Sequence, residues 1–181
     1  MPTLTEALFR AALTQGGLYV GDATLEPSAS FMVFSQTPHA MIDADVWERK
    51  TATFFAMRFG LVVPKTYGDE LPTSDAALVV IANREGQGDL RMIYGRPAEP
   101  RDLVRAQEAE RQGAVGGGLV ELGKRCPGVW LVEANGTDDS SALAIAAIIA
   151  MVHLGPIVPP SGAELYGVRT ARMKLSAASS G

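Results

Sequence analysis

Residues 77–94, ALVVIANREGQGDLRMIY, decide the fold class of this chain. Two apolar runs, Ala77–Ala82 and Leu90–Tyr94, flank a polar, glycine-bearing connection of residues 83–89. Runs of this length, separated by such a connection, are typical of a β-hairpin. A hairpin pairs its strands antiparallel, whereas a doubly wound parallel sheet alternates strand and helix throughout. The stretch therefore predicts an α+β fold with a mixed or antiparallel sheet.

The other elements are predicted from capping boxes, proline positions and apolar runs around this hairpin. The expected strands cover residues 18–25, 30–35, 61–63, 77–82, 90–94 and 129–133. The expected helices cover residues 3–16, 46–59, 100–112, 119–122 and 142–158. Their order is α-β-β-α-β-β-β-α-(α)-β-α, and the adjacent strands 18–25 and 30–35 suggest a second hairpin.

The helix that begins near Val46 carries many of the aromatic residues. Asp45 and Glu48 have the spacing of a capping box, and Gly60 is the expected stop. Charged residues crowd the first turns, whereas the second half is apolar on almost every side. We therefore expect the second half, with Phe54 in it, to be buried.

Ala142–Val158 is an alanine-rich apolar run that is continuous except for His153, and Gly155 and Pro156 interrupt it. It is shorter than the roughly 20 residues that cross a bilayer, so no membrane association is expected. Alanine on all sides suits a helix that is packed closely within a core. We expect a long buried helix here, within a single globular domain over residues 1–175. The small, polar residues 176–181 are expected to form a disordered tail.

Composition excludes several classes of protein. The 181 residues include 16 Lys and Arg against 20 Asp and Glu, so the formal net charge is −4 and no nucleic-acid partner is expected. A single cysteine excludes an intramolecular disulfide and a multi-cysteine metal site. The first residues lack the apolar core of a signal peptide. A cytoplasmic location is the expectation.

The segment Gly118–Arg125 has the G-x-x-x-x-G-K spacing of a phosphate-binding loop. That motif requires a Ser or Thr where Arg125 stands, and it requires a preceding strand that is not predicted here. We therefore interpret the segment as a short helix. No other motif is specific enough to assign a family, a reaction or a cofactor.

Three side chains could carry metal, acid–base or nucleophilic chemistry. His39 lies close in sequence to Asp43 and Asp45, a set that could contribute to a divalent metal site. We favour a solvated loop histidine and assign no metal site. His153, near the end of the apolar run, is expected to be hydrogen-bonded and structural. Cys126 follows two cations that would lower a thiol pKa, although a small buried thiol is the commoner case.

The loop Asn135–Asp139 is the first place to look for a ligand. It follows a predicted buried strand and opens a helix, a position where α/β sheets bind small molecules. Asn135, Thr137 and Asp138 are the candidate ligand-binding residues. The aspartates would repel a phosphate, so a hydroxyl-rich, cationic or metal ligand is expected. The alternative, which the pattern favours, is a well-capped helix without a ligand.

Two functions from different classes fit this sequence. The first is a soluble small-molecule-binding domain, which would be an enzyme if it used carboxylate or metal chemistry. Its pocket would lie between the sheet and the helix bearing Trp47 and Phe54, where His39, Asp43 and the loop 135–139 would converge. The second is a non-catalytic accessory or structural subunit that forms a homo-oligomer or packs on a larger partner protein. Convergent polar residues in a concave site would favour the first, and a large exposed apolar patch the second.

Overall fold

The strands of this protein form one antiparallel sheet. The computed structural model describes residues 25–62, 78–84, 89–113 and 117–179. In these ranges six strands are ordered β2-β3-β4-β5-β1-β6, and each neighbouring pair is antiparallel. The strands are β1 (Ser30–Ser35), β2 (Phe59–Val62), β3 (Leu78–Arg84), β4 (Asp89–Pro97), β5 (Gly128–Glu133) and β6 (Ile157–Val158). The predicted α+β fold with an antiparallel sheet is confirmed.

The hairpin that decided the fold class is formed by β3 and β4. Its register runs from the Leu78–Gly95 pair to the Arg84–Asp89 pair. β4 continues beyond Tyr94 because Gly95 leaves room for the ring of Trp130 on β5. A Cβ atom at Gly95 would lie 2.7 Å from that ring. The hairpin thus extends into the sheet through β5 on one side and β2 on the other.

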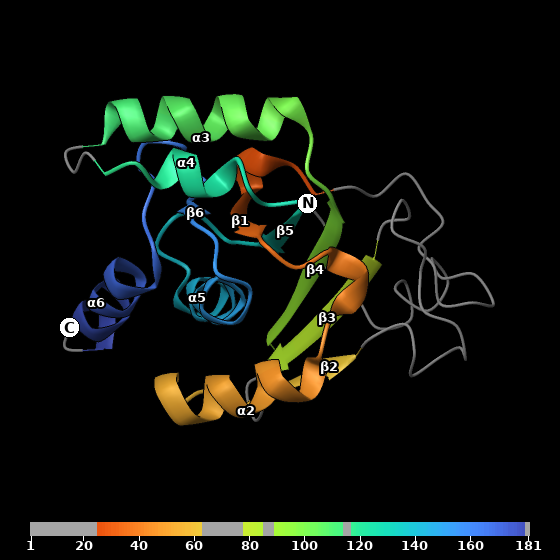
Figure 1. The fold of residues 1–181 in the computed structure, drawn as a ribbon. Helices are drawn as coiled ribbons and strands as arrows, with labels where there is room; N and C mark the ends of the chain where they lie inside the picture. Colours follow the sequence, from red (N-terminus) through yellow and green to blue (C-terminus); the bar gives the residue numbers. More distant parts are fainter. Residues whose placement is uncertain (1–24, 63–77, 85–88, 114–116, 180–181) are drawn as a thin grey trace.

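Helices cover both faces of the sheet, with α3 and α4 on one face and α2, α5 and α6 on the other (Figure 1). The α-helices are α2 (Ala44–Phe55), α3 (Pro100–Gln112), α4 (Leu119–Gly123), α5 (Ser140–His153) and α6 (Val168–Ser179). The short 3-10 helices are η1 (Pro27–Ala29) and η2 (His39–Met41). The third helix therefore has the predicted bounds, and α4 confirms that the G-x-x-x-x-G-K segment is helical.

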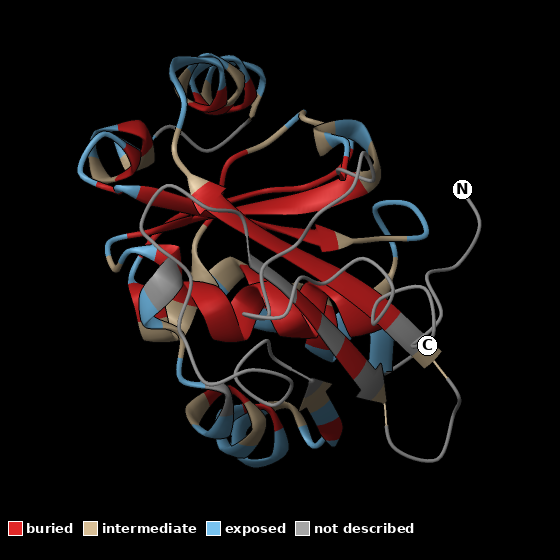
Figure 2. Cartoon of the chain, turned by 90° about the vertical axis from the view of Figure 1, so that its right-hand side faces the viewer, coloured by how far each residue is buried: buried red, intermediate tan, exposed pale blue. Residues whose placement is uncertain are grey.

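Each face of the sheet has its own apolar core, because successive side chains of a strand point to opposite sides. On β1, Phe31 and Val33 belong to the core that includes α5, whereas Met32 and Phe34 belong to the core that includes α3 and α4. The inner strands are consequently buried along almost their whole length (Figure 2). This burial on both faces explains why β1 and β5 have continuous apolar sequences.

The helix predicted from the apolar run is α5, and most of its residues are buried. It ends at His153, just before the interruption at Gly155 and Pro156, because Leu154 adopts a left-handed conformation with φ 57°. Pro156 also lacks the N–H that a helix would need. Ile157 and Val158, expected to be helical, instead form β6 and pair with β1. Among the described residues, no helix is long and apolar enough to cross a membrane.

The prediction for the aromatic helix is wrong in three respects. Asp43, and not Asp45, is the N-cap residue of α2, since its carboxylate accepts a hydrogen bond from Val46 N–H at 3.2 Å. The helix ends at Phe55, and Phe59 lies in β2, where it pairs with β3. Its second half is largely exposed, because only one side of α2 packs against the core.

The C-terminal segment also differs from the expectation. Residues 176–179 belong to α6 and not to a disordered tail. Leu175 of this helix is buried in the core with α5, and its carbonyl accepts a hydrogen bond from the Ser179 hydroxyl at 3.0 Å. The predicted helix 3–16 and most of the predicted strand 18–25 lie outside the described residues.

Candidate functional site

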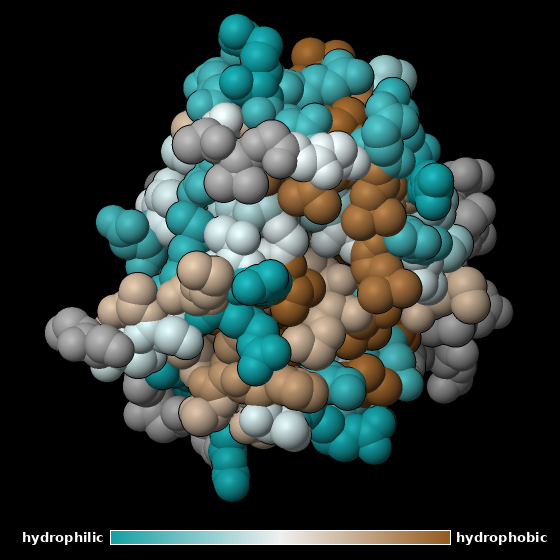
Figure 3. All heavy atoms as spheres, turned by 60° about the vertical axis from the view of Figure 1, so that its left-hand side comes forward, coloured by the Kyte–Doolittle hydropathy of each residue, from teal (hydrophilic) through white to brown (hydrophobic). Residues whose placement is uncertain are grey.

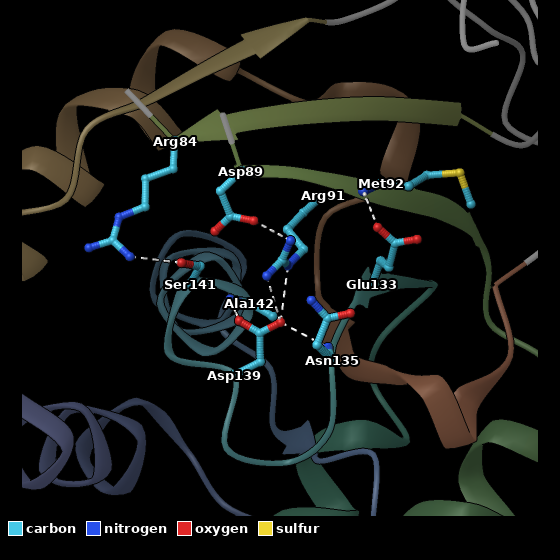
Figure 4. A network of polar contacts seen from close by, with 9 residues as sticks. All are labelled: Arg84, Asp89, Arg91, Met92, Glu133, Asn135, Asp139, Ser141 and Ala142. Atoms are coloured by element: carbon cyan, nitrogen blue, oxygen red, sulfur yellow. Dashed lines mark hydrogen bonds and ion pairs between the residues drawn. The ribbon is translucent and has the colours of Figure 1, made fainter. Parts of the chain in front are cut away.

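The start of α5 gathers polar side chains from β3, β4 and β5 (Figure 4). Asp139 is the N-cap residue, and its Oδ1 accepts a hydrogen bond from Ala142 N–H at 3.1 Å. Its Oδ2 accepts one from Asn135 N–H at 2.8 Å. Gly136, with φ 90°, provides the positive backbone dihedral that this tight loop requires. One carboxylate therefore closes the loop between β5 and α5.

Arg91 on β4 connects this loop to the sheet. Its Nε and Nη2 atoms each lie 3.0 Å from Oδ2 of Asp139, and its Nη1 atom pairs with Asp89. The side chains of Arg91 and Asp139 are only 10% and 5% exposed. Solvent therefore screens this ion pair little, and removal of one partner would be costly.

Arg84 from β3 and Glu133 from β5 complete the cluster. Arg84 donates from Nη1 to the hydroxyl oxygen of Ser141 at 3.0 Å. Glu133 accepts a hydrogen bond from Met92 N–H at 3.4 Å, while burial raises the pKa of its carboxyl group. A raised carboxyl pKa occurs at acid–base sites and also in buried structural carboxyls.

The polar groups of this cluster mainly satisfy one another. Both oxygens of Asp139 accept hydrogen bonds, and Arg91 lies between two carboxylates. Within the described ranges, no group of three His, Cys, Asp or Glu side chains is placed to hold a metal ion. The contacts fix the loop against β4. They correspond to the capped helix start that the sequence pattern favoured.

The three candidate residues of this loop lie at its surface. Asn135, Thr137 and Asp138 are all exposed. Asn135 contributes its backbone N–H to the cluster, whereas the central carboxylate belongs to Asp139, which was not among the candidates. The consecutive residues Asp138 and Asp139 could each cap the helix, so the sequence located the loop without selecting the residue that closes it.

The other candidates do not converge on this loop. His39 lies at the opposite end of β5: a Cβ atom at Gly128 would be 3.3 Å from the backbone nitrogen of His39. A strand of six residues spans about 17 Å at the usual rise, so β5 separates His39 from Asn135. His39 is also buried, not solvated as expected. Asp43 caps α2 at the surface.

Trp47 belongs to the core, together with His153. Its indole N–H donates to Nε2 of His153 at 3.0 Å, and its ring contacts Trp130 edge-on with centroids 4.9 Å apart. Burial lowers the pKa of His153 to about 4. The neutral imidazole thus joins α2 to the end of α5. Trp47 is buried in the core, where it contacts Trp130 and His153.

Cys126 has the properties of a structural thiol. It is buried, and its Sγ lies 3.4 Å from the carbonyl oxygen of Leu122, to which it donates. Burial raises the pKa of the thiol to about 11, the direction opposite to that of an activated nucleophile.

A cleft of about 420 Å³ lies between α2 and α6. Ligand pockets commonly have volumes of this order. The lining residues are Thr53, Phe54, Phe55, Ala56, Met57, Arg172, Leu175, Ser176 and Ser179. Phe54 is 40% exposed although it is a large apolar side chain. This cleft lies between two helices, whereas the pocket predicted from the sequence was placed between the sheet and the helix bearing Trp47 and Phe54.

The sequence held two indications of this cleft that point to α2 and α6. The second half of the aromatic helix is more apolar than one packed side requires, and the chain from Leu165 onward is basic without a single acid. Only the tertiary structure places the two segments beside each other.

No known protein family, no curated protein and no solved structure matches this chain.

Proposed function

We propose that this protein is a small-molecule-binding domain and that its ligand occupies the cleft between α2 and α6. The exposed ring of Phe54, within a concave surface that also includes Phe55, Met57 and Leu175, carries the proposal. An apolar ligand would remove this surface from water, which is favourable by roughly 25 cal/mol per Å² of apolar area.

The lining supports binding more than catalysis. It provides hydroxyl groups and the guanidinium of Arg172, but none of its residues is a carboxylate, a histidine or a cysteine. Arg172 and the hydroxyls can orient a ligand, whereas proton transfer and nucleophilic attack need other groups. We therefore propose a binding site without a reaction.

The accessory-subunit alternative stays a prediction. The large apolar side chains that are exposed among the described residues are Met41, Phe54, Val104, Leu154 and Met173. Phe54 and Met173 lie on the neighbouring helices α2 and α6, whereas Met41, Val104 and Leu154 belong to other parts of the fold. On the face drawn in Figure 3, apolar side chains form a band between hydrophilic ones and do not cover the face.

The test is a titration with octan-1-ol, observed through ¹³C-labelled methionine methyl groups. The Met57 signal, from the cleft lining, should shift and saturate. Met173 is 64% exposed outside the lining and should remain unchanged. Thr53→Trp, which fills the cleft, should abolish the Met57 shift, whereas Ala52→Trp, an exposed position on α2 outside the lining, should preserve it. An unsaturable Met57 shift, or an equal shift in Thr53→Trp, would overturn the proposal.

A further inference from the structure

We infer that the cleft between α2 and α6 selects organic anions, meaning molecules with an apolar body and a carboxylate or similar negative group. The inference rests on the proposed binding function and specifies its ligand class. Two observations carry it: the placement of cations around Phe54, and the lack of a salt bridge at either cation among the described residues.

Two cations lie beside the exposed ring: Arg172, which lines the cleft, and Lys50, which lies on α2 outside the lining. On α2, Nζ of Lys50 is 5.1 Å from the centroid of Phe54, and on α6 the Cζ of Arg172 is 5.8 Å from it. A ring face attracts a cation at such distances, which favours conformations that keep both charges near the cleft. A negative group beside Phe54 could therefore approach both cations while its apolar body covers the ring.

Neither cation has a carboxylate partner in the part of the chain that the structure describes. Among the described residues no salt bridge forms at Lys50 or Arg172, whereas the neighbouring Lys174 pairs with Glu164 at 2.8 Å. Residues 49–58 contain three cations and no acid, and residues 165–181 also contain three cations and no acid. The chain as a whole carries a net charge of −4, whereas these two stretches, which directly follow Glu48 and Glu164, are basic.

The charges should alter selectivity more than they create affinity. Both cations are exposed, and single exposed ion pairs are weak, so we expect the anion to bind about fivefold more tightly than a neutral molecule of the same length. A cationic molecule should bind more weakly than the neutral one. Added salt should reduce these differences, because it shortens the distance over which exposed charges interact, which is about 10 Å at 0.1 M.

Three probes with one chain length test the inference: octanoate, octan-1-ol and octylammonium, each followed through the Met57 methyl signal. We expect affinity to fall in that order. The Lys50→Gln/Arg172→Gln double variant should bind octanoate no better than it binds octan-1-ol. Arg101→Gln/Lys124→Gln is the matched control, since it removes two exposed cations on the other face, one on α3 and one at the end of α4, and should retain the preference.

The outcomes separate the two proposals. If octan-1-ol binds but octanoate binds no better, the anion inference is overturned and the binding function stands. A preference that persists in Lys50→Gln/Arg172→Gln also overturns the inference. If no probe shifts Met57, both proposals fail. A Met57 shift that depends on protein concentration without any probe would place a second copy in the cleft and overturn the small-molecule occupant.

Discussion

The two ends of α5 are held by different chemistry. At its start, Asp139 caps the helix and pairs with Arg91, so a cap and an ion pair of charged side chains hold this end. At its end, His153 is buried and neutral, and it accepts a hydrogen bond from Trp47 of α2. Gly155 then brings the chain against the backbone of β1.

The difference teaches how each end depends on the rest of the chain. Asp139 and Ala142 are three residues apart, so the cap is a local contact. Trp47 and His153 are 106 residues apart, and their bond exists only when α2 has docked on α5. The second end therefore also positions α2, which forms one wall of the proposed binding cleft.

Substitution of one glycine at each end should distinguish a glycine that is needed for space from a glycine that is needed for its backbone conformation. A Cβ atom at Gly155 would lie 1.8 Å from the carbonyl oxygen of Phe34, so Gly155→Ala must displace backbone and should cost about 4 kcal/mol of unfolding free energy. Gly136 has nothing within 4 Å of such an atom but has φ 90°, so Gly136→Ala should cost only about 1 kcal/mol. Urea unfolding measures both. Equal effects would contradict this distinction.

Removal of the central carboxylate should show how much the first end contributes. Asp139→Ala deletes the cap and one partner of Arg91, so we expect a loss of about 3 kcal/mol in unfolding free energy. Asp139→Asn keeps a capping oxygen and should lose less. Asp138→Ala, at the exposed neighbouring position, is the control and should stay within about 0.5 kcal/mol of the parent. If Asp138→Ala were the more damaging change, the assignment of the cap would be wrong.

Acid should weaken the second end through His153. Its folded pKa of about 4 lies below the usual 6.5, so the unfolded chain binds the proton more tightly. The stabilisation is complete above pH 6.5 and is lost as pH falls toward 4, by about 2 kcal/mol between pH 7.5 and pH 5. His153→Gln, which retains an acceptor for Trp47, should remove this part of the pH dependence. Urea unfolding curves at both pH values measure this change. An equal change in unfolding free energy between the two pH values in the parent and in His153→Gln would contradict the prediction.

The smallest effect is expected at Leu154, the left-handed residue that ends α5. It is 61% exposed and has φ 57°, a conformation that glycine adopts without strain. Leu154→Gly should raise the unfolding free energy by about 0.5 kcal/mol, because relief of strain outweighs the added freedom of the unfolded chain. Leu154→Ala keeps the strain and serves as the control. A thermal shift that is the same for both variants would argue against backbone strain here.

Local signals explain which parts of the fold were predictable. The hairpin formed by β3 and β4, the bounds of α3 and the polar loop before α5 depend on residues that are close in sequence. The end of α2 was predicted wrongly because Phe59 suits a helix or a strand equally well by its apolar character. Pairing with Arg84 of β3, far along the chain, selects the strand.

The candidate site was predictable only in part, for the same reason. Composition and periodicity located the loop at residues 135–139, and local geometry there favours a capped helix. The prediction that His39 and Asp43 lie near that loop needed spatial distances, which a sequence does not give. In the structure His39 lies at the opposite end of β5 from the loop.

By itself the sequence determined an α+β chain with an antiparallel sheet, a buried alanine-rich helix and a basic stretch near the C-terminus, because these follow from local pairing, periodicity and charge. Tertiary structure decided that α2 and α6 face each other across a cleft with Lys50 and Arg172 beside Phe54. Packing of both helices on α5 creates that arrangement, and contacts between segments more than a hundred residues apart leave no local pattern in the sequence.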